Sequence, residues 1–555
     1  MRKINKAIAI VLSALLCLAV AGACSKDEDK VYSAKIAVSA QGVRGFETEG
    51  KPFLYLAGEL RTEAYMNLDG KTAEDLHAYI EKAADLGFTV AKVSVNWKDI
   101  EPQKDEYDYS VIRELMQACY DNGVKLELMW YSVLMCGTSH SYHLPEYILS
   151  DRQTYPRLTY VIDGIERDFY KNSTYYGEEF MLHLNNPALM ERETKVIGGI
   201  MDYVYQWEEA RNFPKVLFGV QVYNEADAFP GHYTGNRAEV FLNGNKVDNN
   251  AAWAMLKEAM NNAGKAFKGG KYVPLTCTNL LRPQTAALGS DSGTVTPLSR
   301  SQELVDLEGI DFVGYDPYLQ DLSALKKSIY AYDSEVSGNV TRIDENGGEY
   351  TNTDGLILLA ASMNVGYTVY EVISPAFFSD AHDQGILDKT TFGDKIVVNG
   401  EIEDNYTARA RTMIKGLRAA GSYAAGTKKE NFAAFNIVGN VPGDYWKKTI
   451  KTENVTLAFE TQNAAIGYAL QTEEYVMAFA TQDAVLKLSN SKFSGAESGA
   501  YVANDEFVSA GTVSLKDGDT LEMQGGVFYR IKISETGKKQ TSDTDLYKSS
   551  YRYGN

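Results

Sequence analysis

Two acidic residues stand directly after apolar stretches that we interpret as β-strands. Glu225 ends residues 218–225 (FGVQVYNE), and Glu371 ends residues 366–371 (GYTVYE). Two carboxyl groups brought together by two strands can hydrolyse a glycosidic bond, one as proton donor and the other as nucleophile or base. Each residue alone has a plainer explanation, because polar residues are also common where a strand passes into a helix. The chemistry therefore depends on whether the fold brings the two strands together.

The order of apolar stretches and helical patterns predicts how these strands are arranged. Strands are expected at residues 53–58, 89–95, 124–130, 216–222, 273–278, 310–315, 366–370 and 431–436, and helices at 72–87, 109–122, 187–208, 251–267 and 407–420. Eight strand–helix steps predict an α/β fold of the (β/α)8 TIM-barrel type over residues 36–445. Glu225 then follows the fourth strand and Glu371 the seventh. Both lie at the carboxyl ends of the strands, where such barrels carry their chemistry.

A second, smaller unit follows the predicted barrel. Short alternating strands at residues 456–459, 475–480, 484–488 and 527–533 replace the helices, with a turn signal at residues 517–519 (DGD). This pattern is typical of an all-β sandwich, which we place at residues 446–540. Residues 541–555 are a polar tail without periodicity.

The first residues favour export. Lys3 and Lys6 precede an apolar stretch that ends in residues 18–24 (LAVAGAC), and an acidic stretch follows at 25–30 (SKDEDK). The apolar stretch is too short for an ordinary spanning helix, which indicates a signal peptide at residues 1–23 and an acidic tether at 24–35. Small residues directly before Cys24 resemble the lipobox of bacterial lipoproteins, and the acidic stretch is similar to that of Bacteroides-type surface lipoproteins. The resemblance implies lipidation of Cys24 and anchoring to the outer membrane, at the cell surface or on its periplasmic face.

Composition narrows the candidate partners. The formal net charge of −19 argues against nucleic acid, and 37 Tyr residues suit contacts with sugars. Cys119, Cys136 and Cys277 are too few and too scattered for a disulfide framework or a zinc site, and the six His residues form no metal-binding pattern. We therefore expect no metal and no cofactor.

Three segments carry a further signal: residues 50–59 (GKPFLYLAGE), 95–109 (VNWKDIEPQKDEYDY) and 221–225 (QVYNE). They resemble the clan A glycoside hydrolases, most closely the family 35 and family 42 β-galactosidases. The resemblance covers about residues 50 to 440 and implies a retaining hydrolase with a proton donor after strand four and a nucleophile after strand seven. Tyr223 stands where family 35 has Glu, and residues 60–63 (LRTE) stand where it has His-Tyr, so the sugar stays open.

The resemblance implies roles for the residues at the strand ends. Glu225 would be the acid/base, Glu371 the nucleophile, and Asn224 the donor to a sugar hydroxyl. Tyr315 would bond the nucleophile, and Trp130 would be the main stacking surface for a sugar ring. The remaining candidates for lining the pocket are Glu59, Asn96, Trp97 and Tyr131.

Three alternatives remain open. The chain could hydrolyse β-glucan, mannan or another hemicellulose, and the loop at residues 137–186 would favour exo action by blocking one end of a cleft. It could instead be a non-catalytic surface lipoprotein that binds glycans beside other glycan-uptake proteins. The β domain could itself bind carbohydrate through Tyr501 and Phe528, which are more often core residues.

Overall fold

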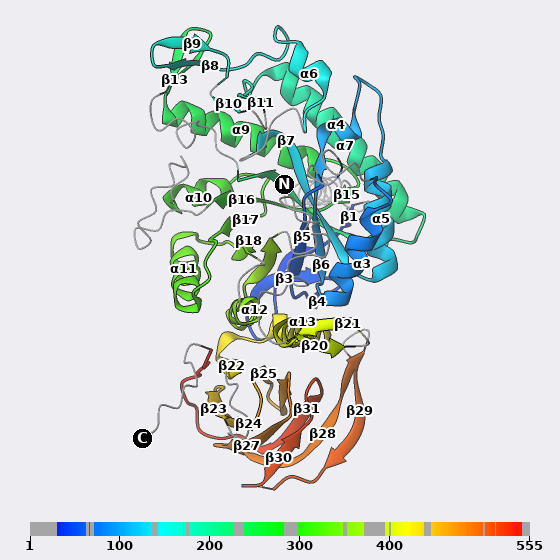
Figure 1. Ribbon diagram of the computed structural model, residues 1–555, viewed down its shortest axis with the longest axis vertical. Helices are drawn as coiled ribbons and strands as arrows, with labels where there is room; N and C mark the ends of the chain where they lie inside the picture. The colour runs from blue at the N-terminus through cyan, green and yellow to red at the C-terminus, as the bar shows by residue number, and fades with distance from the viewer. Residues whose placement is uncertain are drawn as a thin grey trace, which may run out of the picture.

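The computed structural model comprises a barrel of parallel strands and a β-sandwich (Figure 1). The residues that it describes are 30–62, 66, 72–135, 143–169, 171–173, 177–225, 238–281, 298–347, 352–370, 395–398, 401–437, 446–502, 506–516 and 518–546.

Eight parallel strands close the barrel. In chain order they are β5 (Leu56–Leu60), β6 (Val90–Asn96), β7 (Lys125–Met135), β12 (Leu217–Asn224), β16 (Leu275–Leu281), β17 (Phe312–Asp316), β18 (Arg342–Gly347) and β19 (Gly366–Tyr370). Each strand pairs with the next, and β19 pairs with β5 to complete the ring. The predicted (β/α)8 barrel is confirmed, and the first six strands are those expected from the sequence.

The last two predicted strands were assigned wrongly. Residues 366–370 form the eighth barrel strand, not the seventh, and β22 (Phe432–Ile437) pairs with β25 (Ala465–Gln471) in the C-terminal sandwich. The true seventh strand is β18, whose sequence RIDENG contains one aliphatic residue, Ile343. Its side chains Arg342 and Asp344 are buried charges inside the barrel, so the stretch lacks the apolar pattern by which buried strands are recognised.

Helices surround the barrel on the outside (Figure 1). The principal ones are α3 (Leu76–Leu86), α5 (Ser110–Asn122), α7 (Pro187–Glu209), α9 (Asn249–Lys268), α10 (Leu298–Val305), α11 (Leu322–Glu335), α12 (Thr353–Ser362) and α13 (Asn405–Ala419), with the shorter α4 (Trp97–Ile100), α6 (Glu146–Ser150) and α14 (Gly421–Gly426). Gly87 and Gly123 end α3 and α5 with φ of 97° and 61°. This left-handed conformation suits Gly because it has no Cβ.

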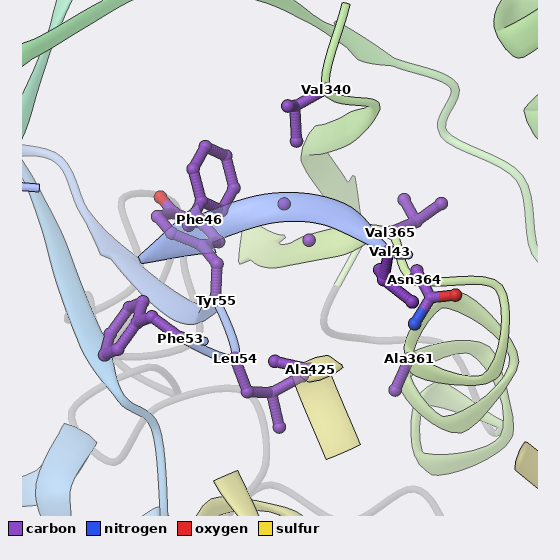
Figure 2. Close-up of a pocket in the computed structure, with 12 residues that line it drawn as sticks. Val43, Phe46, Phe53, Leu54, Tyr55, Val340, Ala361, Asn364, Val365 and Ala425 are labelled. Carbon is purple, nitrogen blue, oxygen red and sulfur yellow. The ribbon is translucent and has the colours of Figure 1, made fainter. Parts of the chain in front are cut away.

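The N-terminal end of the barrel is closed by apolar side chains. β2 (Lys35–Val38), β3 (Arg44–Thr48) and β4 (Lys51–Pro52) form a small sheet, from which Phe46 packs against Phe218 and Phe312 at ring-centroid distances of 5.4 and 5.0 Å. A cavity of about 30 Å³ lies beside Phe46, lined mainly by apolar side chains such as Val340 and Val365 (Figure 2). It is at the opposite end of the strands from the residues predicted to be functional.

Loops between barrel elements contribute small sheets. β8 (Thr159–Ile162), β9 (Ile165–Arg167), β13 (Ala238–Leu242) and β14 (Asn245–Val247) form one antiparallel sheet, β10 (Lys171–Ser173) pairs with β11 (Gly177–Glu179), β20 (Lys395–Val398) with β21 (Glu401–Asp404), and β1 (Val31–Tyr32) with β15 (Tyr272–Val273). The first sheet joins insertions that follow strands three and four, on the side where those strands end.

Two antiparallel sheets form the C-terminal sandwich. One contains β22, β25, β26 (Tyr475–Ala480), β28 (Lys492–Val502), β29 (Glu506–Val513) and β31 (Phe528–Glu535), and the other β23 (Trp446–Lys451), β24 (Thr456–Thr461), β27 (Ala484–Ser489) and β30 (Thr520–Met523). Side chains from both sheets, including Phe435 and Phe459, form one buried core between them. Tyr501 and Phe528 instead belong to the larger core that contains the barrel and its helices. Among the described residues, no helix has the length and apolar character needed to cross a membrane.

Candidate active site

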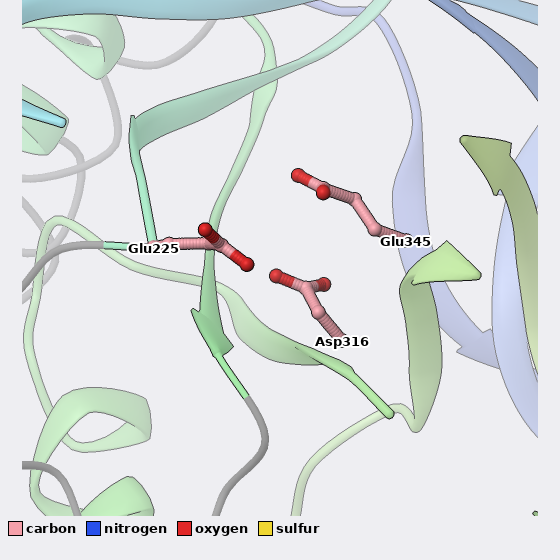
Figure 3. A group of neighbouring side chains, drawn as sticks. All are labelled: Glu225, Asp316 and Glu345. Atoms are coloured by element: carbon pink, nitrogen blue, oxygen red, sulfur yellow. The ribbon is translucent and has the colours of Figure 1, made fainter. Parts of the chain in front are cut away.

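Three carboxyl groups meet at the carboxyl ends of the barrel strands. They belong to Glu225, directly after β12, Asp316, the last residue of β17, and Glu345 in β18. One oxygen of each lies within 4.8 Å of an oxygen of each of the others. Figure 3 shows the three side chains pointing toward one another. Asp316 and Glu345 are buried, whereas Glu225 is partly exposed, so the cluster reaches solvent on the Glu225 side.

The Asn279 amide on β16 connects the members of the cluster. Its Nδ2 lies 2.7 Å from Asp316 Oδ2 and 3.2 Å from Glu345 Oε1, and its Oδ1 accepts the backbone N–H of Glu225 at 2.8 Å. Asn279 Nδ2 also donates to Asn224 Oδ1 at 3.0 Å, and Asn224 Oδ1 accepts a second bond from Gln221 Nε2 at 2.8 Å. Since both donors come from buried barrel residues, Asn224 is held with its side chain toward the cluster.

Glu345 is held by donors and by nearby cations. The Tyr318 hydroxyl donates to its Oε2. Burial raises the pKa of the Glu345 carboxyl, while the charge of Lys92, the hydrogen bond from Tyr318 and the charge of Arg61 favour its ionised form. Tyr318 is partly exposed and packs edge-on against Tyr370, whose hydroxyl accepts a bond from Arg61 at 3.1 Å. These side chains form the rim of the site next to Glu345.

Asp316 lies in an environment that disfavours its charged form. Burial, together with the charges of Glu345 and Glu225, holds the pKa of Asp316 well above its ordinary value. Carboxylates this close cannot all ionise without strong repulsion. Asp316 therefore keeps a proton more readily than a carboxyl group in water does.

Charged residues inside the barrel support the strand that carries Glu345. Arg342 makes two hydrogen bonds to Glu127, at 2.6 and 2.8 Å, and a third to Asp344. Lys92 lies 3.6 Å from Glu59 and donates to the backbone oxygen of Asp344 at 2.9 Å. Burial works to lower the pKa of Lys92, but the carboxylates of Glu59 and Asp344 raise it above its ordinary value, so Lys92 stays charged.

The structure brings some of the predicted residues together and turns others away. Asn224 and Glu225 lie at the cluster, and Glu59 lies below it inside the barrel. Trp97 and Trp130 do not line the site, because both are fully buried in the core outside the strands. Trp97 bonds Glu101 at 3.1 Å, and Trp130 packs against Trp97 and Phe267.

The prediction for Tyr315 is also wrong. Tyr315 stacks on Tyr332 of α11 at 4.5 Å and lies 3.3 Å from the Ser328 hydroxyl, so it faces the helices. Tyr318, three residues later, is the tyrosine that bonds Glu345. Alternation along the strand explains the difference, because Tyr315 and Asp316 must point to opposite faces.

The remaining predicted residues have mixed outcomes. Asn96 is buried and donates to Asp99 Oδ2 at 2.5 Å. Tyr131 is buried beside Met129 in a small cluster separate from the outer core. Glu371 and Cys24 lie outside the described residues. The reason for choosing Glu371 does not hold, since it follows the eighth strand and the seventh carries Glu345.

Sequence reasoning missed Glu345, Asp316, Tyr318 and Asn279. One signal could have led to Glu345. In an alternating β/α chain a strand is expected between two successive helices, and Glu345 lies between α11 and α12. Asp316 directly follows a recognised strand, as Glu225 does. It could have been found by applying the same rule to every strand.

Carboxylate oxygens are also the ligands that Ca²⁺ and Mg²⁺ prefer, so the three acidic side chains could hold such an ion. However, Asn279 and Tyr318 direct hydrogen-bond donors at Asp316 and Glu345. The cluster is thus arranged around hydrogen bonds between strand ends.

Fold and site together define a (β/α)8-barrel protein with a carboxyl cluster at the mouth of the barrel. A family model described as "Domain of unknown function (DUF4978)" matches residues 255–442, which include Asp316 and Glu345. No curated protein matches the chain.

Solved structures with similar folds include an exo-β-1,4-mannosidase from Opitutaceae bacterium strain TAV5 (15% identity, TM-score 0.41, 68% of this chain and 62% of that chain covered). A cold-adapted β-galactosidase from Rahnella sp. R3 has 12% identity and a TM-score of 0.43, with 71% and 59% covered. An endogalactoceramidase has 13% identity and a TM-score of 0.40, with 92% and 100% covered. The chain thus spans about three fifths of the length of the first two.

Proposed function

We propose that this chain is a retaining glycoside hydrolase that cleaves β-glycosidic bonds, with Glu345 as nucleophile and Glu225 as acid/base. The observation that carries the proposal is the meeting of these two carboxyl groups, from the ends of strands four and seven, with oxygens within 4.8 Å. Retaining enzymes need carboxyl groups about 5–5.5 Å apart, whereas inverting enzymes need about 6.5–9.5 Å to admit a water molecule. Oxygens within 4.8 Å are compatible with the separation that the retaining reaction needs.

The reaction proceeds in two displacements. An oxygen of Glu345 attacks the anomeric carbon and forms a glycosyl ester while the glycosidic C–O bond breaks, and Glu225 gives its proton to the leaving oxygen. Glu225 then removes a proton from water, which attacks the anomeric carbon and releases Glu345 as a carboxylate. In this proposal the side-chain amide of Asn224 bonds the sugar hydroxyl next to the anomeric carbon.

The environment of each group suits its proposed task. Burial holds the pKa of Glu345 above its ordinary value, and Lys92, Tyr318 and Arg61 act against this rise and favour the ionised form that a nucleophile requires. Glu225 is the partly exposed member of the cluster, so it can reach an oxygen of a bound substrate. The partly exposed ring of Tyr318 can contact a sugar beside Glu345.

The proposal is tested by hydrolysis assays on a panel of substrates. The panel contains 2,4-dinitrophenyl and p-nitrophenyl β-galactosides, β-mannosides and β-glucosides, together with β-linked disaccharides of the same sugars. These arms separate a β-galactosidase-like specificity from action on mannan or β-glucan. The configuration of the first-formed product is read by proton NMR, and the proposal requires retention.

Matched variants assign the two roles. Glu345→Gln is expected to abolish turnover, and Glu345→Gly to regain it with azide, which takes the place of the missing carboxylate. Glu225→Gln should lose activity on disaccharides and retain glycosylation by dinitrophenyl glycosides, whose leaving group needs no proton. Glu371→Gln is the control, with activity within a few-fold of wild type.

Two results would reject the proposal. If Glu371→Gln abolishes turnover while Glu345→Gln is active, the nucleophile is on strand eight. If the wild-type chain binds glycans but hydrolyses none of the panel, it is a glycan-binding protein.

We also propose that the protein is anchored to the outer membrane through Cys24 and faces its glycan substrate at the cell surface. The proposal rests on the apolar stretch and the small residues before Cys24. Labelling of cells with radioactive palmitate should mark the wild-type protein and not Cys24→Ser. Protease added to intact cells should degrade a surface protein and spare a periplasmic one.

A further inference from the structure

The fourth barrel strand has an irregular end just before Glu225. Its pairing with β7 shifts register between Val222 and Asn224, as at a β-bulge. Val222 and Tyr223 both belong to the core outside the barrel, although neighbours on a regular strand point to opposite faces. Gln221 and Asn224 both bond to Asn279 inside the barrel. The bulge therefore directs the side chains of Asn224 and Glu225 toward the mouth of the barrel.

The bulge has an unfavourable backbone conformation. Tyr223 has φ of 64° and Glu225 has φ of 43°, both in the left-handed region that residues with a Cβ disfavour. Tyr223 is also completely buried. Such a conformation persists only where surrounding contacts hold it, so the contacts of the Tyr223 side chain, together with the bond from the Glu225 N–H to Asn279, determine where Glu225 lies.

The Tyr223 hydroxyl donates to Glu193 Oε2 on α7 at 3.0 Å. Glu193 is 1% exposed and also accepts from Trp130 Nε1 at 2.9 Å and from Ser132 Oγ at 2.5 Å. The three donors that reach it from the described strands are uncharged. Burial raises the pKa of Glu193, and the bonds from Ser132, Trp130 and Tyr223 act in the opposite direction.

Glu193 thus ties the ends of strands three and four to one helix. Trp130 and Ser132 lie on β7, and Tyr223 lies on β12. Helix α7 is itself fixed at its start, where Asn186 Oδ1 accepts the N–H of Leu189 at 3.0 Å. The Tyr318 hydroxyl donates to Glu345 from the other side of the site, so this support of Glu345 does not depend on Glu193.

We propose that Glu193 is a positioning residue for the acid/base: it holds the Tyr223 bulge and so sets the place from which Glu225 delivers its proton. This inference rests on the proposed function. It predicts a defect confined to the proton-transfer role, because Glu345 keeps its own support.

The test compares substrates that differ in their need for a proton. Glu193→Gln replaces one accepting carboxylate oxygen by an NH2 group, which is a donor. This group cannot accept hydrogen bonds from Trp130, Ser132 and Tyr223, although the side chain keeps its size. We expect kcat/KM to fall at least tenfold on a β-linked disaccharide and less than threefold on the 2,4-dinitrophenyl glycoside of the same sugar. Tyr223→Phe, which removes a single hydroxyl group, should show the same selectivity with a smaller loss.

Helix α7 offers a matched control in Glu208, another buried carboxylate that bonds the same strand at its other end. Its Oε1 accepts the N–H of Val216 at 2.7 Å, and its Oε2 accepts that of Lys215 at 2.8 Å. Glu208→Gln should lower stability and change both substrates by the same factor. This control separates damage to the helix–strand contact in general from displacement of Glu225.

Equal losses on the two substrates in Glu193→Gln and Tyr223→Phe would overturn the inference and leave Glu193 with a structural role only. If Glu193→Gln does not fold, Tyr223→Phe decides the question, and uniform or absent loss in that variant rejects the proposal. Failure of the proposed function is recognised separately, because the wild-type chain would then hydrolyse neither substrate.

Discussion

Replacing Arg342 by Met tests whether buried charges hold the strand that carries Glu345. Arg342 is fully buried, bonds both oxygens of Glu127 and lies 4.5 Å from the Tyr55 ring centroid. Met fills much of the same space but leaves Glu127 and Asp344 without this cation. Breaking a buried ion pair on one side costs about 3–5 kcal/mol. That is a large share of the about 5–15 kcal/mol by which proteins are stable.

The assay is urea unfolding followed by tryptophan fluorescence. Four of the five Trp residues lie before residue 260 and one, Trp446, lies in the sandwich. A Trp446→Phe background therefore reports the barrel alone. With a slope of about 3 kcal/mol per molar urea, Arg342→Met should move the barrel midpoint down by about 1 to 1.7 M.

The double variant Arg342→Met with Glu127→Met is the control. Removing both partners removes the uncompensated charge, so it should recover at least half of the lost midpoint. A shift below about 0.3 M in the single variant, with an unchanged slope, would refute the reasoning. So would a double variant that is no more stable than the single one.

Three further predictions concern the site itself. The pKa of Asp316 is raised in the folded chain, so between about pH 4 and this raised pKa the folded chain holds a proton that the unfolded chain has released. The stability of the protein should therefore fall as pH rises through that interval. Asp316→Asn should flatten the dependence of Tm on pH, and an unchanged slope would contradict the assignment. Tyr318→Phe removes the hydrogen bond to Glu345 and should lower kcat about tenfold to a hundredfold, as a bond to a charged group is worth about 1.5–3 kcal/mol; unchanged kcat would exclude this role. Gly314→Ala would place a Cβ in collision with the Asp344 carboxylate, so a loss of about 1–3 kcal/mol is expected in the same urea assay, and a neutral result would show that Asp344 can move.

The strand before Glu225 illustrates what local sequence can establish. Its residues are almost all apolar and it is buried along its whole length, so both its existence and its polar end were predictable. The alternation of such strands with amphipathic helices was enough to predict the barrel, and the later short strands were enough to predict the sandwich. The bulge at Tyr223 was not predictable, because it depends on a contact with Glu193 on a different element.

The seventh strand shows the opposite case. Arg342 and Asp344 are acceptable inside the barrel only because Glu127 and Lys92, far away in the chain, lie opposite them. A local pattern contains no record of such partners, so no strand was expected at residues 342–347, and the count of strands shifted by one. The wrong glutamate was then chosen as nucleophile.

The sequence by itself determined the barrel, the sandwich and the place of Glu225, since these follow from hydrophobic periodicity and from the residue at one strand end. Only the tertiary structure decided which other carboxyl groups join Glu225, and which aromatic side chains face the site. Trp130 and Tyr315 face the helices, whereas Asp316 and Glu345 face the mouth. The physical reason is that direction depends on strand register, bulges and buried charge pairs, which are set by contacts between residues distant in the chain.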